Sequence, residues 1–490
     1  MSEPAPPSPD EVVALLAATP TQAFLAGRWI DTGATFPVVD PATGADIAAV
    51  ADAGPELFVA ALDAADEAQP RVAAIAPRER AEILRRTHEL MLRDRERLAT
   101  LITLEMGKPL AESRGEVTYA AEFFRWFAEE TCRVEGDYRT NPAGTGRILV
   151  THRPVGPCLL ITPWNFPIAM GARKIAPAFA AGCTSILKPA TATPLTMLAL
   201  AGLLEEAGLP AGALSVLPAT DSSGTTGPLF QDPRLRKVSF TGSTEVGRAL
   251  MRQSSEQILR ISLELGGSAP FLVFEDADLD TAVDGAMAAK LRNGGEACTA
   301  ANRFLVHESV ADEFASRLTE RIAAQVVGPG LDPASQVGPM IDAGAQQRLA
   351  ETVAAAAEAG ARVTTGGRAL DRPGFFFEPT VVTGLPEDCA IDRDELFGPV
   401  APIRTFTTED EAIAMANDSP YGLVSFVFTE QLARGLRVSE ALESGMVGLN
   451  RGVVSDPAAP FGGVKQSGLG REGGRQGIHE YLEPRYLALP

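Results

Sequence analysis

Long apolar segments are missing from this 490-residue chain. No run of about 18 apolar residues is free of charges and helix breakers, so we predict no membrane span and no membrane partner. The first residues, MSEPAPPSPDE, contain no basic stretch that leads into an apolar one, which a secretory signal would have. We expect these residues to form a short flexible tail.

Cysteine is also scarce. The five cysteines lie far apart and include no CxxC or CxxH pair: Cys132, Cys158, Cys183, Cys298 and Cys389. A disulfide framework or a structural zinc site is therefore not expected, and we predict that the protein holds no metal. Free cysteines are typical of the reducing cytoplasm, which is the predicted location.

Basic residues and histidines are few as well. The chain has 43 Lys and Arg against 63 Asp and Glu, which gives a net charge of −20. Such a protein would repel a phosphate backbone, so a nucleic acid is not expected as its partner. None of the four histidines lies in a Gly-rich or turn segment. A hydrolase built on a Cys-His pair is therefore disfavoured.

The pattern along the chain predicts the fold class. Residues 56–132 have an apolar repeat close to 3.6, which is typical of helices. After residue 157, apolar strands alternate with helices, and the expected strands are 158–162, 185–188, 214–217, 238–241, 260–265 and, in a second series, 271–274 and 304–307. This rhythm predicts an α/β fold with mostly parallel, doubly wound sheets, divided at Gly266–Gly267.

The segment FTGSTEVG (240–247) follows one of these strands and opens a helix. Gly242 lets the backbone approach a ligand, and the free N–H groups after Ser243 favour an anion such as a pyrophosphate. The spacing differs from the G-x-G-x-x-G fingerprint of dinucleotide sites. A plain Gly-Ser helix cap is therefore an alternative.

Two residues are candidates for covalent chemistry. Cys298, in RNGGEACTAANRF, has the polar, Gly-rich surroundings that a reactive thiolate needs, although a lone cysteine is usually a small buried apolar residue. Glu264, in LELGG, ends an apolar strand, where partial burial would raise the pKa of a carboxyl toward that of a useful base. A structural ion pair is the alternative for Glu264.

Asn165 and Lys188 are candidates for binding. Both follow strands of the first series, at the carboxyl edge where ligands bind in open α/β sheets. The Asn165 amide could hold a developing oxyanion, and Lys188 could bond ribose hydroxyls or a phosphate. A turn asparagine and a solvated lysine are the alternatives.

Taken together, these segments resemble the aldehyde dehydrogenase superfamily over nearly the whole chain. The segments that carry the resemblance are PWNFP (163–167), KPA (188–190), FTGS (240–243), LELGG (263–267), GGEACTAANR (294–303), ELFGPV (395–400) and PFGGVKQSGLGREG (460–473). The resemblance implies two doubly wound α/β domains and a small β bridging domain. The implied divisions are a dinucleotide-binding domain (1–133 and 154–265), a catalytic domain (266–460) and a bridging arm (134–153 and 461–490).

The resemblance also implies roles for single residues. Cys298 would be the nucleophile and Glu264 the general base, and the Asn165 amide would bind the oxyanion together with the Cys298 backbone N–H. The positions that match cofactor contacts are Trp164, Asn165, Lys188, Thr191, Gly242, Ser243, Leu265, Glu395 and Phe397. The implied reaction oxidises a small aldehyde through a cysteine thioester and reduces NAD or NADP, in a homodimer or homotetramer.

Within the superfamily, the chain is most similar to the enzymes that oxidise succinate semialdehyde to succinate. Arg173, Arg292 and Ser455 match the positions that hold the far carboxylate of that substrate. Buried arginines without an anion would be costly, so such a group suits a dicarboxylic semialdehyde. Surface salt bridges are the alternative for these arginines. For the protein, the alternatives are another substrate such as glutarate semialdehyde, a wider range of aldehydes, CoA-acylating dehydrogenation, and a catalytically silent member.

The sequence departs from its relatives at two positions. Ala300 stands where some members carry a second cysteine, so we expect no disulfide switch beside the nucleophile. Thr191 stands where NAD-preferring relatives often carry a glutamate. Without that carboxylate a 2′-phosphate is not repelled and can pair with Lys188. We therefore predict that NADP is accepted and is preferred over NAD.

Overall fold

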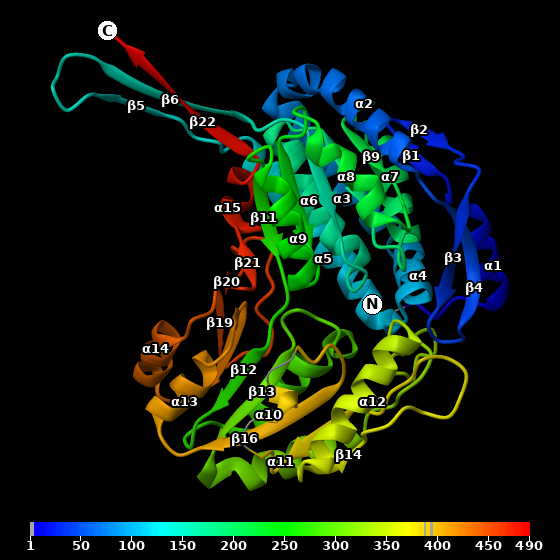
Figure 1. Cartoon of the computed structure of the whole chain (residues 1–490), viewed down its shortest axis with the longest axis vertical. Coiled ribbons are helices and arrows are strands. Elements are labelled where there is room, and N and C mark those ends of the chain that lie inside the picture. The colour runs from blue at the N-terminus through cyan, green and yellow to red at the C-terminus, as the bar shows by residue number, and fades with distance from the viewer. Residues whose placement is uncertain (1–3, 387–388, 393–394) are drawn as a thin grey trace.

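The computed structural model describes residues 4–386, 389–392 and 395–490. Its two large sheets contain eight and seven strands, and they lie in the upper and lower halves of Figure 1. A three-stranded sheet projects from the body as an arm. The predicted α/β class with mostly parallel sheets is confirmed.

Five neighbouring strands of the first sheet run parallel, in the order β9-β8-β7-β10-β11. They are short apolar runs that are buried because helices cover the sheet. Antiparallel strands close both edges. The strands are β1 (Ala23–Leu25), β2 (Arg28–Ile30), β7 (Cys158–Ile161), β8 (Ser185–Lys188), β9 (Leu214–Val216), β10 (Lys237–Thr241), β11 (Arg260–Glu264) and β21 (Gly468–Leu469).

The region predicted as helical, 56–132, consists of four helices. The helices of this half of the molecule are α2 (Pro55–Ala74), α3 (Pro77–Arg93), α4 (Arg95–Met106), α5 (Leu110–Thr131), α6 (Pro167–Ala181), α7 (Leu195–Glu206), α8 (Ser222–Gln231) and α9 (Thr244–Ser255). Gly107 ends α4 in the left-handed conformation, with φ 95°. A Cβ there would lie 2.7 Å from Pro339, so only glycine fits this close approach.

The prediction of a flexible tail is wrong for its last three residues, 9–11, which are helical. Helix α1 (Pro9–Ala18) begins directly after Ser8, whose side chain accepts the Glu11 N–H at 3.4 Å. The Glu11 carboxylate accepts the Ser8 N–H in return, at 2.7 Å. This capping box and the proline at the first helical position are start signals that the sequence analysis missed. A hairpin of β3 (Thr35–Asp40) and β4 (Ala45–Ala51) follows in the chain.

The second sheet has the order β14-β15-β16-β13-β12-β18-β19, and all its pairs except β14 with β15 are parallel. Phe271 lies at its centre and stacks on Phe428 with 4.6 Å between the ring centroids. The strands are β12 (Ala269–Val273), β13 (Ala301–His307), β14 (Arg362–Thr365), β15 (Thr380–Thr383), β16 (Val400–Phe406), β18 (Val424–Phe428) and β19 (Met446–Leu449).

Helices flank this sheet as well. They are α10 (Leu279–Leu291), α11 (Glu308–Ala323), α12 (Ala343–Glu358), α13 (Glu409–Asn417) and α14 (Leu432–Ala441), with the short turns η1 (Arg292–Gly295) and η2 (Ala390–Asp392). The small strands β17 (Tyr421–Gly422) and β20 (Val464–Lys465) pair with each other.

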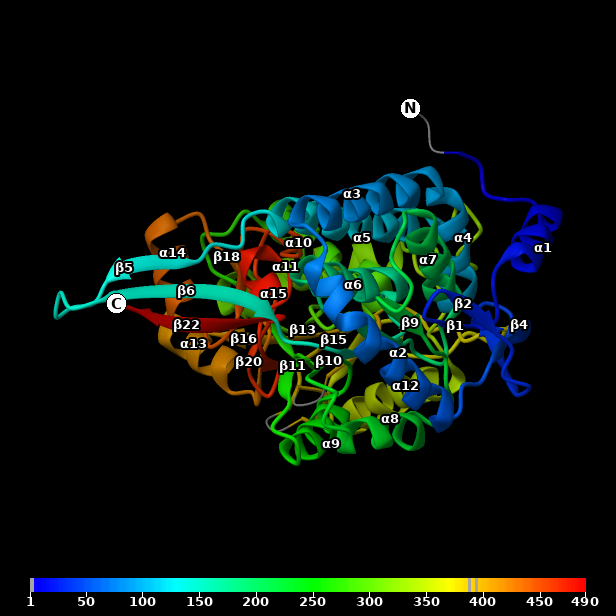
Figure 2. The same cartoon turned by 90° about the horizontal axis from the view of Figure 1, so that it is seen from above.

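The arm consists of β5 (Asp137–Thr140), β6 (Arg147–Pro154) and β22 (Leu482–Leu489). Strand β22 pairs antiparallel with β6 along its whole length, and Figures 1 and 2 show the arm extending away from the body. Helix α15 (Gly474–His479) leads into β22. The segment 461–490 thus supplies one strand to the first sheet and one to the arm.

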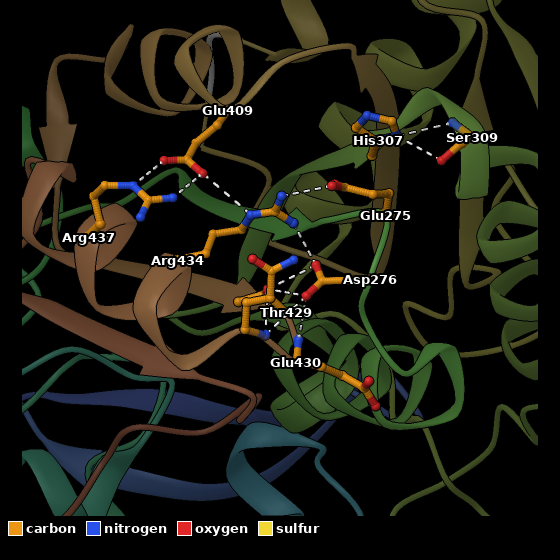
Figure 3. A network of polar contacts seen from close by, with 10 residues as sticks. Glu275, Asp276, His307, Ser309, Glu409, Thr429, Glu430, Arg434 and Arg437 are labelled. Carbon is orange, nitrogen blue, oxygen red and sulfur yellow. Dashed lines mark hydrogen bonds and ion pairs between the residues drawn. The ribbon is translucent and has the colours of Figure 1, made fainter.

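A cluster of paired charges lies at the carboxyl ends of β12 and β18 (Figure 3). Arg434 donates to Glu275 at 2.7 Å and to Asp276 at 2.6 Å, and its Nε lies 3.4 Å from Glu409. The hydrogen bond from Arg434 lowers the pKa of Glu275. A hydrogen bond from Arg437 lowers the pKa of Glu409 in the same way. We call these five side chains the Arg434 cluster.

Across the described ranges, no helix combines the length and the apolar character that crossing a membrane requires.

Candidate active site

The carboxyl edge of the first sheet gathers the loops that follow its parallel strands. Ile161 pairs with Lys188 and Phe240, and Thr241 pairs with Glu264, so these strands end at one level. The chain therefore brings Asn165, Gly242 and Glu264 to the same edge.

The amino edge of the second sheet faces this region. Ala269 at the start of β12 pairs with Ala301 at the start of β13, and Cys298 lies just before β13. The chain passes from β11 to β12 through Gly266 and Gly267 (Figure 1). A Cβ on Gly267 would lie 2.6 Å from the Cys298 carbonyl oxygen. Glycine at this position therefore permits the close approach of the Cys298 loop.

A cavity of about 210 Å³ opens between these edges. The sequence-predicted residues that line it are Trp164, Asn165, Arg173, Gly242, Ser243, Glu264, Leu265, Arg292, Cys298, Glu395, Phe397 and Ser455. All three proposed catalytic side chains and all three proposed carboxylate ligands are thus in one place. Lys188 and Thr191 are not among the lining residues.

Several residues that line the cavity were not predicted from the sequence. Tyr119, Phe166, Met170, Thr299 and Phe461 also line it. Tyr119 belongs to the helical region, whose apolar residues indicated only core packing. Phe461 and Phe166 lie inside segments that carried the family resemblance, so a closer reading of those segments could have found them.

The Cys298 side chain is half-buried in this cavity. Burial raises the pKa of its thiol to about 12, although the positive charge of Arg173 opposes that shift. The raised pKa favours the thiol form, and the thiol must lose its proton to a base before it can act as a nucleophilic thiolate.

Glu264 is a buried carboxyl that lines the cavity. Neither of its oxygens accepts a hydrogen bond from the described part of the chain. Burial raises the pKa of Glu264 well above its ordinary value, and the nearby Glu472 adds to the shift. The alternative of a structural ion pair therefore finds no support among the described residues, and the carboxyl has the perturbed pKa typical of functional sites.

Arg173 is only 1% exposed and is already paired. Its Nε donates to Glu472 at 2.5 Å, and its guanidinium carbon lies 4.0 Å from the Phe461 ring centroid. Lys174 donates to the other oxygen of Glu472 at 2.5 Å. Within the described residues, the Nη2 of Arg173 has no hydrogen-bond partner, so one face of the guanidinium is left for an anion.

Arg292 and Ser455 complete the group that was predicted to hold a carboxylate. Arg292 is half-buried, and its guanidinium carbon lies 5.1 Å from the Phe166 ring centroid. Ser455 lines the same cavity from the chain that follows β19.

Asn165 is 5% exposed and its amide points toward the Cys298 loop. Its Nδ2 donates to the Glu296 carbonyl oxygen at 2.9 Å. An amide nitrogen carries two hydrogens, so one donor is left for an oxygen of a bound substrate. The arrangement suits a thiol that attacks a carbonyl beside a fixed amide donor.

The aldehyde dehydrogenase family model matches residues 29–487 of this chain. The chain belongs to the aldehyde dehydrogenase family. It is 59% identical to a succinate-semialdehyde dehydrogenase of Paenarthrobacter nicotinovorans, over 90% of this chain and 98% of the relative. It is 48% identical to the succinate-semialdehyde dehydrogenase [NADP(+)] of Escherichia coli K12, over 96% and 97%.

Another relative and a solved structure also support membership of the aldehyde dehydrogenase family. A glutarate-semialdehyde dehydrogenase of Pseudomonas aeruginosa is 48% identical, over 96% of this chain and 97% of the relative. The crystal structure of a succinate-semialdehyde dehydrogenase from Burkholderia pseudomallei has a TM-score of 0.95 at 46% identity, covering 96% of this chain and 98% of the other.

In this aldehyde dehydrogenase, the positions predicted to contact a cofactor lie along the carboxyl edge of the first sheet and beside the cavity. Ser243 caps α9 by accepting the Val246 N–H at 3.4 Å, which leaves other N–H groups of the first turn for an anion. Trp164 and Phe397 meet edge to face at 5.5 Å beside the cavity. Glu395 accepts the Gly267 N–H at 3.0 Å, and burial raises its pKa to about 7.

Lys188 and Thr191 lie farther along the same edge. Burial lowers the pKa of Lys188 to about 8, while Asp52 opposes the shift. The lysine donates to the Pro189 carbonyl at 3.3 Å, and Thr191 donates to the Ala219 carbonyl at 3.1 Å.

Proposed function

We propose that the protein oxidises succinate semialdehyde to succinate and reduces NAD(P), with Cys298 as the nucleophile. The observation that carries the proposal is the single cavity in which Cys298, Glu264 and Asn165 meet two arginines. Relatives whose names state this activity share 48% to 59% of their sequence with this chain, which supports the same substrate.

The chain's residues account for the first half of the reaction. The Cys298 thiolate adds to the aldehyde carbon, and the resulting oxyanion accepts hydrogen bonds from the Asn165 amide and the Cys298 backbone N–H. A bound oxidised nicotinamide supplies the acceptor for the hydride. The oxyanion then re-forms a C=O bond as the C–H bond breaks, and a thioester remains on Cys298.

Glu264 carries the second half. Its carboxylate accepts a proton from a water molecule that attacks the thioester carbon, and the Cys298 thiolate leaves. The unpartnered carboxyl and its raised pKa support this role, because an ion-paired carboxylate would be a weaker base. Hydrolysis by water also distinguishes this reaction from transfer to CoA.

The first test is a panel of aldehydes with both nucleotides. We expect the highest kcat/KM for succinate semialdehyde, and no activity in Cys298→Ala. Mass spectrometry during turnover should find an acyl adduct on Cys298 in the active enzyme. A Cys298→Ser protein that still reduces the nucleotide at full rate would overturn the proposal.

The substrate carboxylate is proposed to bind Arg292, Ser455 and the free face of Arg173. Because Arg173 also holds Glu472, Arg173→Ala would disturb a buried pair as well as the substrate. Arg292→Ala is therefore the cleaner variant. We expect a strong rise of KM for succinate semialdehyde and little change for butanal, which has four carbons and no carboxylate. Equal effects on both aldehydes would contradict the carboxylate site.

Glutarate semialdehyde is the second candidate substrate, because two relatives named for it are 48% and 47% identical to this chain. The same arginines would bind its carboxylate. Comparing kcat/KM for the two semialdehydes decides between them.

The preference for NADP is proposed from Thr191. The Thr191 hydroxyl donates to the Ala219 carbonyl, and a threonine carries no carboxylate that would repel a 2′-phosphate at this position. Thr191→Glu should shift the ratio of kcat/KM for NADP and NAD toward NAD by about tenfold, as expected for a loss of 1 to 2 kcal/mol. An unchanged ratio would overturn this explanation.

We also propose a homodimer or homotetramer in the cytoplasm, with the division into domains implied by the family. The arm supports this, because it leaves Tyr138 and Tyr486 more than 60% exposed on a projecting sheet. Light scattering of the purified protein measures the oligomeric state directly.

A further inference from the structure

The backbone carbonyl of Asn165 is held from two sides by buried side chains. Lys108 donates to it from its Nζ at 2.7 Å, and Asn293 donates from its Nδ2 at 3.0 Å. Both side chains belong to residues that are 2% exposed. Neither side chain is among the residues that line the cavity at Cys298. The contacts therefore fix the peptide of Asn165 without touching the reacting atoms.

Lys108 connects this carbonyl to the start of α6. Its ammonium pairs with Glu116 at 2.5 Å, and the other oxygen of Glu116 accepts the N–H groups of Ile168 and Ala169 at 3.1 and 3.2 Å. One ion pair thus fixes the peptide of Asn165 relative to the first turn of α6.

Asn293 connects the same carbonyl to the Cys298 loop. Its backbone is left-handed, with φ 59° and ψ 34°, and its N–H donates to the Glu112 carboxylate at 3.0 Å. Its Nδ2 also donates to the Glu296 carbonyl at 2.9 Å, which is the oxygen that the Asn165 amide binds. Two amides therefore share one carbonyl that lies just before Cys298.

We propose that Lys108 and Asn293 are positioning residues that hold the two oxyanion donors, the Asn165 amide and the Cys298 backbone N–H, in register with each other. The proposal rests on the function proposed above. Preorganised donors lower the barrier because they need not move when negative charge develops on the substrate oxygen. A displacement of about 1 Å can cost on the order of a hundredfold in rate.

Lys108→Met and Asn293→Gly test the proposal. Methionine keeps much of the length of lysine, and glycine tolerates the left-handed backbone of Asn293. We expect kcat for succinate semialdehyde to fall about 10- to 100-fold, with KM changed less than about threefold since ground-state binding is retained. Alkylation of Cys298 by iodoacetamide forms no oxyanion, so its rate should stay within about twofold.

A double-mutant cycle makes the test sharper. If Lys108 acts through Asn165, then Lys108→Met should cost almost nothing further in an Asn165→Ala background. Additive losses of kcat would overturn the proposal, and so would an unchanged kcat in both single variants.

Lys237→Met is the matched control for the loss of a buried lysine. Lys237 is fully buried and donates to Ser262 at 2.5 Å, away from the cavity. We expect this variant to lose thermal stability and to keep its kcat. If Lys108→Met lowers kcat, alkylation rate and thermal stability together, as a loosened fold would, the positioning role is wrong.

Hydrolysis of p-nitrophenyl acetate separates this proposal from the proposed function. That reaction needs the thiol and the oxyanion donors but no nucleotide or semialdehyde. A wild-type protein that hydrolyses the ester but does not oxidise the semialdehyde would refute the substrate assignment alone. Lys108→Met and Asn293→Gly should still slow the ester reaction, and an undiminished rate would refute the positioning role.

Discussion

The edge at the cavity and the far edge, formed by the carboxyl ends of the second sheet, use ionisable residues in opposite ways. At the cavity edge, Glu264 at the end of the first sheet is buried and Cys298 just before β13 is half-buried, and the pKa values of both are raised. At the far edge, Arg434 satisfies Glu275 and Asp276. Burial alone would raise the pKa of Asp276, but hydrogen bonds from Thr429 and the backbone together with Arg434 lower it. Acidic groups that a partner satisfies stabilise the fold, and those left unpaired are available for reaction.

The difference follows from what surrounds each edge. The far edge receives the start of α14, which carries Arg434 into the middle of the carboxylates (Figure 3). At the cavity edge, Gly462 approaches Glu264 closely, and the nearby Arg173 and Lys174 donate their hydrogen bonds to Glu472 instead. A buried carboxyl without a partner costs stability, which an enzyme tolerates where the group performs chemistry.

The largest expected effect comes from Glu264→Gln. Kcat should fall about 10²- to 10⁴-fold because the variant has no general base, and acyl-enzyme should accumulate on Cys298. Thermal stability should stay the same or rise, since the amide is neutral and loses no hydrogen bond in the described structure. Mass spectrometry during turnover measures the acyl-enzyme, and a melting curve measures the thermal stability. A marked loss of stability with little loss of kcat would show that the two edges do not differ as we infer.

Arg434→Met should have the reverse effect. Removing the guanidinium leaves Glu275 and Asp276 without their cation, and we expect a loss of about 2 to 3 kcal/mol in the free energy of unfolding. The kcat of the folded enzyme should not change. Unfolding by urea together with kcat of the soluble fraction provides the comparison, and a loss of kcat at full stability would contradict it.

Much of the cavity edge could be predicted because its residues follow strands. Asn165, Gly242 and Glu264 each lie at or shortly after the end of an apolar strand, so the sequence identifies the loops that carry them. Because these strands pair in parallel, their loops meet at one edge of the sheet. The resemblance added the roles of Cys298 and Arg292, which strand patterns do not reveal.

The far edge could not be predicted in this way. Arg434 and Asp276 are distant in sequence and meet only through the order of strands in the second sheet, which local patterns do not determine. Glu472 was missed for the same reason, because its pairing with Arg173 depends on the path of the C-terminal segment. Helix α1 was different, since Ser8 and Glu11 form a local signal that was present and overlooked.

The pH dependence separates the two edges further. The cluster carboxylates have lowered pKa values, so their stabilisation is present above their ordinary pKa of about 4 and is lost as the pH falls through the lower folded values. Arg434→Met should therefore flatten the loss of stability in acid. Cys298 and Glu264 have raised pKa values, so kcat should rise with pH above neutrality, by at most about tenfold per unit for one ionisation. A kcat that falls between pH 7 and 9 would contradict the second expectation.

The smallest loss of stability should come from Arg437→Met. Arg437 lies one helical turn after Arg434 in α14. The Arg437 side chain is 58% exposed and pairs with Glu409 at 2.7 Å, whereas the Arg434 side chain is 14% exposed. Solvent screens an exposed pair, so we expect a loss of less than about 1 kcal/mol, which added salt reduces further. Both variants remove one positive charge from the same helix. Equal losses in urea unfolding would mean that net charge, and not burial of the paired carboxylates, stabilises this edge.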